Sequence, residues 1–243
     1  YPHYLTSEWA APYRQQRIEQ LLRSRSRHSI DDMAAMQADV LSLATQRLLP
    51  WLQRARSEHA LAAATQAALK DFNGDMRADL AAPLIFSAWS RQFVRALVID
   101  DLGGPAVYER VLGARSFRDA LEGVLERDDA WWCDDKTTAD TAETCEQISN
   151  MALTRALDEL QRRHGADVST WRWGDAHVAR SEHRPFSRVK GIAPLFELRV
   201  PTGGDTYTLN VGRVGVKPDG TTGELYLNEH APSLRAIYDL GDL

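Results

Sequence analysis

The stretch PLIFSAWSRQFVRAL, residues 83–97, decides the fold class of this chain. Large apolar residues recur in it at intervals of four: Ile85, Trp89, Phe93 and Leu97. Residues at this spacing share one face of an α-helix. Pro83 suits the first turn, where the N–H that proline lacks would have no partner, and Gly103 and Gly104 are typical of a helix end. The sequence therefore predicts a helix with an apolar, inward face.

Helical spacing continues towards the N-terminus. Pro12 can open a helix, and Ser29, followed by Asp32, has the features of an N-cap. The apolar residues after Ser29 keep spacings of three and four: Met33, Met36, Val40, Ala44 and Leu48. We expect a helix through these positions, with Pro50 breaking or kinking the pattern late, and a third helix over about 58–70.

Towards the C-terminus the pattern changes from helix to strand. Shorter helices are expected near 105–112 and 116–126, and a long one from about Thr144 to His164 that Gly165 ends. Its buried side would hold Ile148, Met151, Ala152, Leu157 and Leu160. Beyond residue 165 the period becomes two. The alternating residues are Phe196, Leu198 and Val200, then Tyr207, Leu209 and Val211, on either side of a turn at 201–205.

These patterns predict an α+β fold. A predominantly helical block (about 11–164) is followed by antiparallel strands (about 193–240), with Leu225–Leu227 and about 234–240 as the last two. Residues 1–165 would form a helical region, and residues 166–243 a strand-rich segment that joins the sheet of a larger protein.

Composition limits the classes of partner. The chain has 243 residues, 44% of them hydrophobic, and a formal net charge of −5. Phosphate binding needs a concentrated basic face, so we expect no nucleic-acid partner. No run of about 18 apolar residues is present to span a membrane, so we expect no membrane partner. The chain starts at Tyr1 without a signal-peptide pattern and ends abruptly, and we expect both ends to continue in a longer protein.

The two cysteines, Cys133 and Cys145, bracket an acidic segment. They lack the neighbouring histidines or further cysteines of a zinc site. We favour a disulfide that closes this short loop over two free thiols, and a disulfide places the protein in an oxidising compartment.

Other residues that suggest chemistry have simpler interpretations. The acidic cluster does not follow the spacing of an EF-hand: Asp128, Asp129, Asp134 and Asp135. We expect a solvated acidic loop there, with a calcium-dependent binding domain as a rival. His177 and His183 have no third metal ligand nearby and are interpreted as packing groups, while Trp171 and Trp173 would cover a core. The sequence holds no Gly-x-Ser-x-Gly, His-Glu-x-x-His or glycine-rich phosphate motif.

Several segments, in order across nearly the whole chain, resemble the β chain of the penicillin acylase (penicillin amidase) family, amide hydrolases with an N-terminal nucleophile. They are YPHYL (1–5) with Trp9 and PYRQQRI (12–18), DMAAMQADV (32–40), WCDD (132–135) with Cys145, WRWG (171–174) with His177, GGD (203–205) with TLN (208–210), and APSLR (231–235). No single segment is specific, and their shared order carries the resemblance.

The resemblance implies an internal fragment of that β chain. In the family a serine exposed by autocatalytic cleavage attacks the amide carbonyl, its own α-amine acts as base, and backbone N–H groups with an asparagine hold the oxyanion. Tyr1 has no aliphatic hydroxyl and cannot replace that serine. The nucleophile, the asparagine and any calcium ligands are therefore expected outside this segment, which alone would be inactive, hold no metal and bind no cofactor.

The resemblance implies one site residue. Arg14 occupies the place of an arginine that organises the active-site pocket in the family, and Arg17, one turn later, is the alternative. Either arginine would otherwise cap or salt-bridge a surface helix. The acyl pocket would be lined by the segment near Trp171 or by residues of the apolar helix: Phe86, Trp89 and Phe93.

The functional expectation is a fragment of a periplasmic hydrolase that cleaves linear amides, such as an acyl side chain on a β-lactam nucleus or an acyl-homoserine lactone. Its partners would be a small-molecule acyl amide and the remainder of the same hydrolase, namely the α chain and the N-terminal part of the β chain. The alternative is a non-catalytic periplasmic helical scaffold or interaction module.

Overall fold

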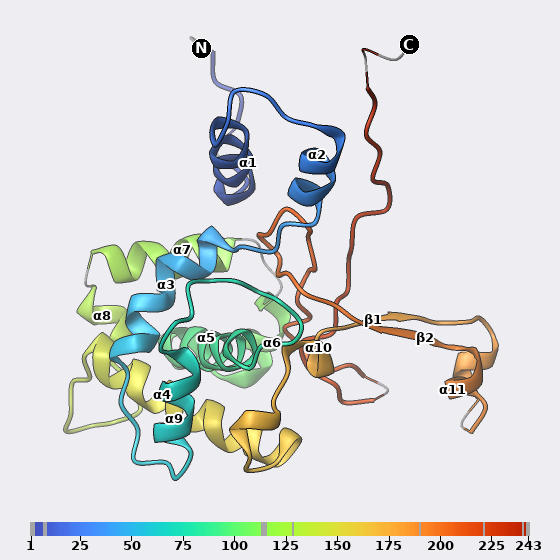
Figure 1. Cartoon of the computed structure of the whole chain (residues 1–243). Coiled ribbons are helices and arrows are strands. Elements are labelled where there is room, and N and C mark those ends of the chain that lie inside the picture. The colour runs from blue at the N-terminus through green and yellow to red at the C-terminus, as the bar shows by residue number, and fades with distance from the viewer. Residues whose placement is uncertain are drawn as a thin grey trace.

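Helices α5 (Ala82–Val98) and α9 (Cys145–His164) pack side by side at the centre of the structure (Figure 1). The computed structural model describes residues 3–6, 9–112, 116–127, 129–189, 191–220, 222–239 and 241. All four predicted inward residues of α5 are at most 2% exposed. The predicted face of α9 is also buried, at Ile148, Ala152, Leu157 and Leu160, with Met151 partly buried beside them. The helical prediction from apolar spacing is confirmed.

The other described helices are shorter, and α3, α4, α8 and α10 contact α5. Before α5 lie α1 (Tyr13–Arg23), α2 (Ile30–Gln37), α3 (Leu43–Arg54) and α4 (Ala62–Leu69). Between α5 and α9 lie α6 (Pro105–Val111), α7 (Ser116–Glu126) and α8 (Ala130–Cys133). After α9 come the 3-10 turn η1 (Val168–Thr170), α10 (Trp173–Ala176), the 3-10 turn η2 (Phe186–Arg188) and α11 (Ala193–Phe196). No described helix is long and apolar enough to cross a membrane.

The helix predicted to run from Ser29 past Leu48 is wrong, because the chain leaves the helix after α2 and begins α3 at Leu43. Ser29 forms the predicted capping box with Asp32. Between the helices the chain is extended and bonds to the 74–76 segment, with Ser42 N donating to Gly74 O at 2.9 Å and Met76 N to Val40 O at 3.0 Å. Ser42 then caps α3 through its hydroxyl, and Pro50 lies inside α3.

The sheet consists of strands β1 (Val178–Ser181) and β2 (Leu198–Pro201), paired antiparallel. The register pairs Ala179 with Val200, and Arg180 with Arg199. A helical block followed by antiparallel strands is therefore confirmed. Figure 1 shows the hairpin extending away from the helical body, with α11 near its far end.

The strands expected after residue 201 are not formed within the described residues. Asp205 accepts hydrogen bonds from Tyr207 N at 2.7 Å and Thr208 N at 2.9 Å, which folds this segment into turns. β2 consequently pairs with the earlier β1, and 193–196 is helical. Residues 225–227 form no strand, the isolated bridges lie at the following residue, Asn228, and residues 234–239 also form no strand. The alternation of apolar and polar residues predicts an extended backbone, but it does not indicate which segment lies beside it as a paired strand.

The predicted disulfide joins Cys133, at the end of α8, to Cys145, the first residue of α9. Both residues are buried. The adjacent Thr144 caps α9 in a second capping box, with Gln147. The bond therefore ties the short α8 to the start of the central helix.

Candidate functional site

Helix α1 carries both arginines that the sequence singles out, and the structure gives them different environments. Arg17 is held by Asp39, with Nε to Oδ1 at 3.0 Å and Nη2 to Oδ2 at 2.7 Å. Tyr13 is buried and its hydroxyl donates to the Glu122 carboxylate. Arg14 is exposed and has no hydrogen bond or ion pair to any described residue. Helix α1 is thus anchored through Tyr13 and Arg17 and leaves the Arg14 guanidinium available.

The aromatic residues proposed for an acyl pocket lie in the core instead. Phe86, Trp89 and Phe93 are at most 4% exposed. The rings of Phe86 and Phe93 have centroids 5.8 Å and 5.0 Å from that of Trp89, and the Trp89 indole N–H donates to Ser149 Oγ at 3.2 Å. Phe86 also packs near Phe72, and Phe93 near Trp51 of α3. Because all three rings are buried in the core, their assignment to a pocket wall is wrong.

The tryptophans after α9 cover the core, as predicted. Trp171 and Trp173 are at most 1% exposed, so the pocket assignment for the segment near Trp171 is also wrong. The Trp173 indole N–H donates to the Gly204 carbonyl at 3.0 Å, which holds the turn before Asp205 against the core.

The two histidines lie in different environments. His177 is fully buried, stacked on Trp173 with ring centroids 4.4 Å apart, and its Nδ1 donates to the Tyr226 carbonyl at 2.7 Å. Burial lowers the pKa of His177 to about 4 despite that hydrogen bond. His183 is exposed and stacks on Phe186. Both histidines pack against aromatic rings, and the structure does not bring them together.

Hydrogen bonds between its own residues stabilise the acidic loop. Asp135 Oδ1 accepts from Thr137 N at 3.0 Å and from Thr137 Oγ1 at 2.6 Å, and these bonds lower the pKa of Asp135. Asp134 accepts from Glu143 N at 3.3 Å, and Asp129 forms a long ion pair with Arg127 at 3.8 Å. Asp128 lies outside the described residues. Among the described residues no group of three or more His, Cys, Asp or Glu side chains is arranged to hold a metal ion.

A buried network centred on Glu159 escaped the sequence analysis. Glu159, on α9, accepts from Arg91 Nη1 at 2.8 Å, from Gln92 Nε2 at 3.0 Å and from the Tyr226 hydroxyl. Burial raises the pKa of Tyr226 well above its ordinary value, so its phenol remains a donor. Tyr226 also has a positive φ of 69°, which costs a non-glycine residue free energy. The network ties α5, α9 and the Tyr226 segment together.

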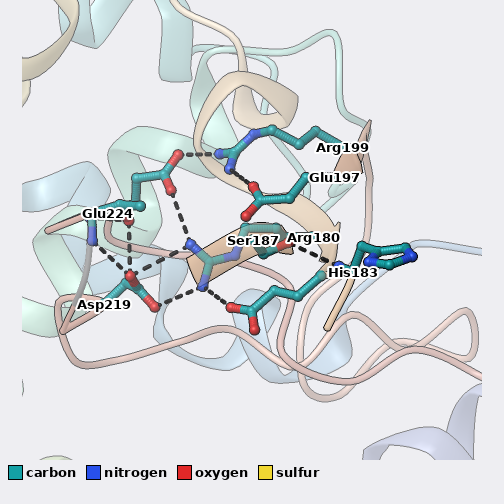
Figure 2. Close-up of polar contacts among 9 residues, drawn as sticks. Arg180, His183, Ser187, Glu197, Arg199, Asp219 and Glu224 are labelled. Atoms are coloured by element: carbon teal, nitrogen blue, oxygen red, sulfur yellow. Dashed lines mark hydrogen bonds and ion pairs between the residues drawn. The ribbon is translucent and has the colours of Figure 1, made fainter. Parts of the chain in front are cut away.

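A second polar network lies on the hairpin, where Figure 2 shows several carboxylates around two arginines. Arg180 Nη2 contacts Asp219 Oδ2 at 3.0 Å and Glu182 Oε1 at 2.8 Å, and its Nη1 lies 3.7 Å from Glu224 Oε2. Arg199 contacts the same Glu224. Burial lowers the pKa of Arg180, but the bond to Asp219 and the surrounding carboxylates raise it above its ordinary value. These charges hold the hairpin against the 219–224 loop.

Comparison with known proteins places the chain. The family model for penicillin amidase matches residues 1–243. This chain belongs to the penicillin amidase family. Curated relatives include the acyl-homoserine lactone acylases QuiP of Pseudomonas aeruginosa, 27% identical over 98% of this chain and 31% of the relative, and of Pseudomonas putida, 29% identical over 98% and 30%. The chain thus spans about three tenths of the length of these curated relatives, and the family resemblance seen in the sequence is confirmed.

One hydroxyl–carboxylate pair in this penicillin amidase chain has the residue types of a nucleophile and a base. Ser42 Oγ donates to Asp205 Oδ2 at 2.5 Å, and Thr45 Oγ1 lies 3.3 Å from the same oxygen. Ser42 is 0% exposed and its oxygen already caps α3, so no substrate reaches it. The pair joins α3 to the Asp205 turn and has a structural role.

Proposed function

We propose that this chain is part of an amide hydrolase that removes the acyl group from a linear amide, such as a β-lactam side chain or an acyl-homoserine lactone. The match of the penicillin amidase model to residues 1–243 carries this proposal. Relatives that match 98% of the chain are named as acyl-homoserine lactone acylases, which supports the second substrate class. The remaining polypeptide of the hydrolase is the partner that completes the enzyme.

In the proposed reaction a serine outside these residues attacks the amide carbonyl, with its α-amine as base and an oxyanion hole formed outside this chain. The contribution of this chain is Arg14. Its guanidinium is exposed and has no partner among the described residues, while Tyr13 and Arg17 hold the backbone of α1 in place. We propose that Arg14 organises the pocket edge against the rest of the hydrolase.

The test uses the full-length hydrolase and a chromogenic acyl amide. Arg14→Ala is expected to lower kcat/KM by about tenfold or more, in line with the loss of a charged hydrogen bond. Arg23→Ala on the same helix is the matched control, because the Arg23 side chain is 79% exposed and its ion pair within the described part of the chain is with Glu19, and it should retain wild-type kcat/KM. Equal kcat/KM values for both variants would remove Arg14 from the site, and a wild type that hydrolyses no acyl amide would overturn the proposed function.

The segment alone and its compartment are also part of the proposal. The isolated 243-residue chain should not hydrolyse the acyl amide, because the nucleophile lies elsewhere; turnover by it would contradict this. The Cys133–Cys145 disulfide supports an oxidising compartment, and we propose the periplasm. Any calcium of the complete hydrolase would be held by ligands outside this segment.

A further inference from the structure

The two faces of the β1–β2 hairpin differ in chemistry. Because side chains alternate across a strand, the register places Arg180 opposite Arg199 on one face and Ala179 opposite Val200 on the other. The arginine face is occupied by the carboxylates of Asp219 and Glu224 (Figure 2). The opposite face is made of small and apolar side chains.

The apolar face is open to solvent. Leu198 is 64% exposed and Val200 is 43% exposed, and both lie on the face of β2 opposite to Arg199. We call this surface, together with the apolar residues at the end of the hairpin, the hairpin apolar surface. Its further members, all exposed, are Phe186, Val189, Leu195 and Phe196.

The end of the hairpin is ordered by its own contacts. Phe186 packs on Phe196 with ring centroids 4.6 Å apart and on His183 at 5.0 Å. His183 N donates to Ser187 Oγ at 2.8 Å. The exposed rings therefore belong to a built surface that joins η2 and α11, and they are not scattered single residues.

Such a surface calls for a covering partner. A two-stranded hairpin is marginally stable by itself, and contiguous exposed apolar residues mark interaction sites. About seven tenths of the length of the curated relatives lies outside the region that this chain matches, so a hydrolase of that length contains a larger polypeptide segment that can cover this surface.

We propose that the hairpin apolar surface docks against an apolar face of the remaining polypeptide of the same hydrolase. This inference rests on the proposed function for the identity of its partner. The docking contact centres on Leu198 and Val200, and the ion pairs of Arg180 and Arg199 hold the hairpin in the orientation that presents them.

The experiment is photo-cross-linking in the full-length hydrolase. Leu198→p-benzoylphenylalanine places the reactive group on the surface, and the same replacement at Gln66, an exposed position of α4, is the matched control. After irradiation, mass spectrometry of the digest identifies the cross-linked peptides. We expect the variant at Leu198 to cross-link to peptides of the same molecule that lie outside these 243 residues. The variant at Gln66 should give no such cross-link, or a much weaker one.

Three results would overturn the docking: no cross-link at Leu198, cross-links confined to residues 1–243 of the same molecule, or cross-links between copies. Mixing ¹⁴N- and ¹⁵N-labelled enzyme identifies the last case. Hydrolysis of the acyl amide is measured on the same preparation before irradiation. Hydrolysis without the expected cross-link overturns the docking alone, whereas the cross-link without hydrolysis overturns the proposed function alone.

Discussion

Apolar side chains are buried in the α5–α9 pair but exposed on the β1–β2 hairpin. Trp89 and Phe93 of α5 are 0% exposed, whereas Leu198 of β2 is 64% exposed. The helices bury their apolar faces against each other. On the hairpin the arginines pair with carboxylates, but the apolar side chains of β2 remain exposed. The central helices therefore pack on each other, while the hairpin presents apolar side chains that the described residues leave exposed.

The charged groups of the two regions also differ in how far they are buried. In the core, Glu159 is buried and bonded to Arg91, Gln92 and Tyr226. On the hairpin, the Arg180 side chain is only 12% exposed, but its partners Asp219 and Glu182 are 21% and 42% exposed, against 8% for Glu159. Since removing one partner of a buried carboxylate costs more than breaking an ion pair with an exposed one, stability should depend more on the core than on the hairpin.

The largest expected effect tests the core side of this contrast. Trp89→Ala should lower the free energy of unfolding by about 3–5 kcal/mol, because it leaves a cavity between α5 and α9. Trp9→Ala removes a tryptophan that is 68% exposed and should change it by less than about 0.5 kcal/mol. Urea unfolding followed by far-ultraviolet circular dichroism measures both, and equal losses would mean that the α5–α9 core is not the stabilising unit.

The next effect concerns the bond that ties α8 to α9. Cys133→Ser should lower the free energy of unfolding by about 2–4 kcal/mol, since the closed loop restricts the unfolded chain. Wild-type protein in reductant should match the variant. If the melting temperature of the wild type is the same with and without reductant, the bond does not contribute.

A smaller effect on the free energy of unfolding is expected from pH, through His177 between α10 and β1. Burial lowers the pKa of His177 to about 4, below its ordinary value of 6.5, so between these pH values the unfolded chain binds a proton that the folded chain does not. Stability should therefore fall as pH drops through the window from 6.5 to 4, by about 2 kcal/mol between pH 7 and pH 5. Denaturant titrations at these two pH values test this, and His177→Gln should lose less stability over the same step. An unchanged pH dependence in that variant would assign the effect to another group.

The smallest effect is expected on the hairpin. Leu198→Lys should change the free energy of unfolding of the 243-residue chain by less than about 0.5 kcal/mol, because the leucine is already solvated. Chemical denaturation compared with wild type measures the change. A loss of stability as large as that of Trp89→Ala would show that Leu198 is buried within the 243-residue chain. It would contradict the contrast between a buried helical core and an exposed hairpin.

Local sequence rules predicted the helices well and the tertiary partners poorly. Ile85 and Trp89 were placed by spacing, and the Ser29 cap by its residue type. The break before α3 was missed because the apolar spacing of three and four continues past Val40, and the cap that Ser42 forms on α3 is seen only in the structure. Glu159 had a signal as well, since a charged residue interrupts the apolar face of α9, but its partner Arg91 lies 68 positions away.

The sequence by itself determined the central helices, the cysteine pairing and the family, because each depends on spacing or on residue types in order. Only the tertiary structure decided that Phe86, Trp89 and Phe93 fill a core, that β2 pairs with β1, and that Leu198 stays exposed while Arg180 is covered. Those outcomes depend on which distant segments meet, and the free energy of such contacts is set by burial and hydrogen bonding between residues that local periodicity does not connect.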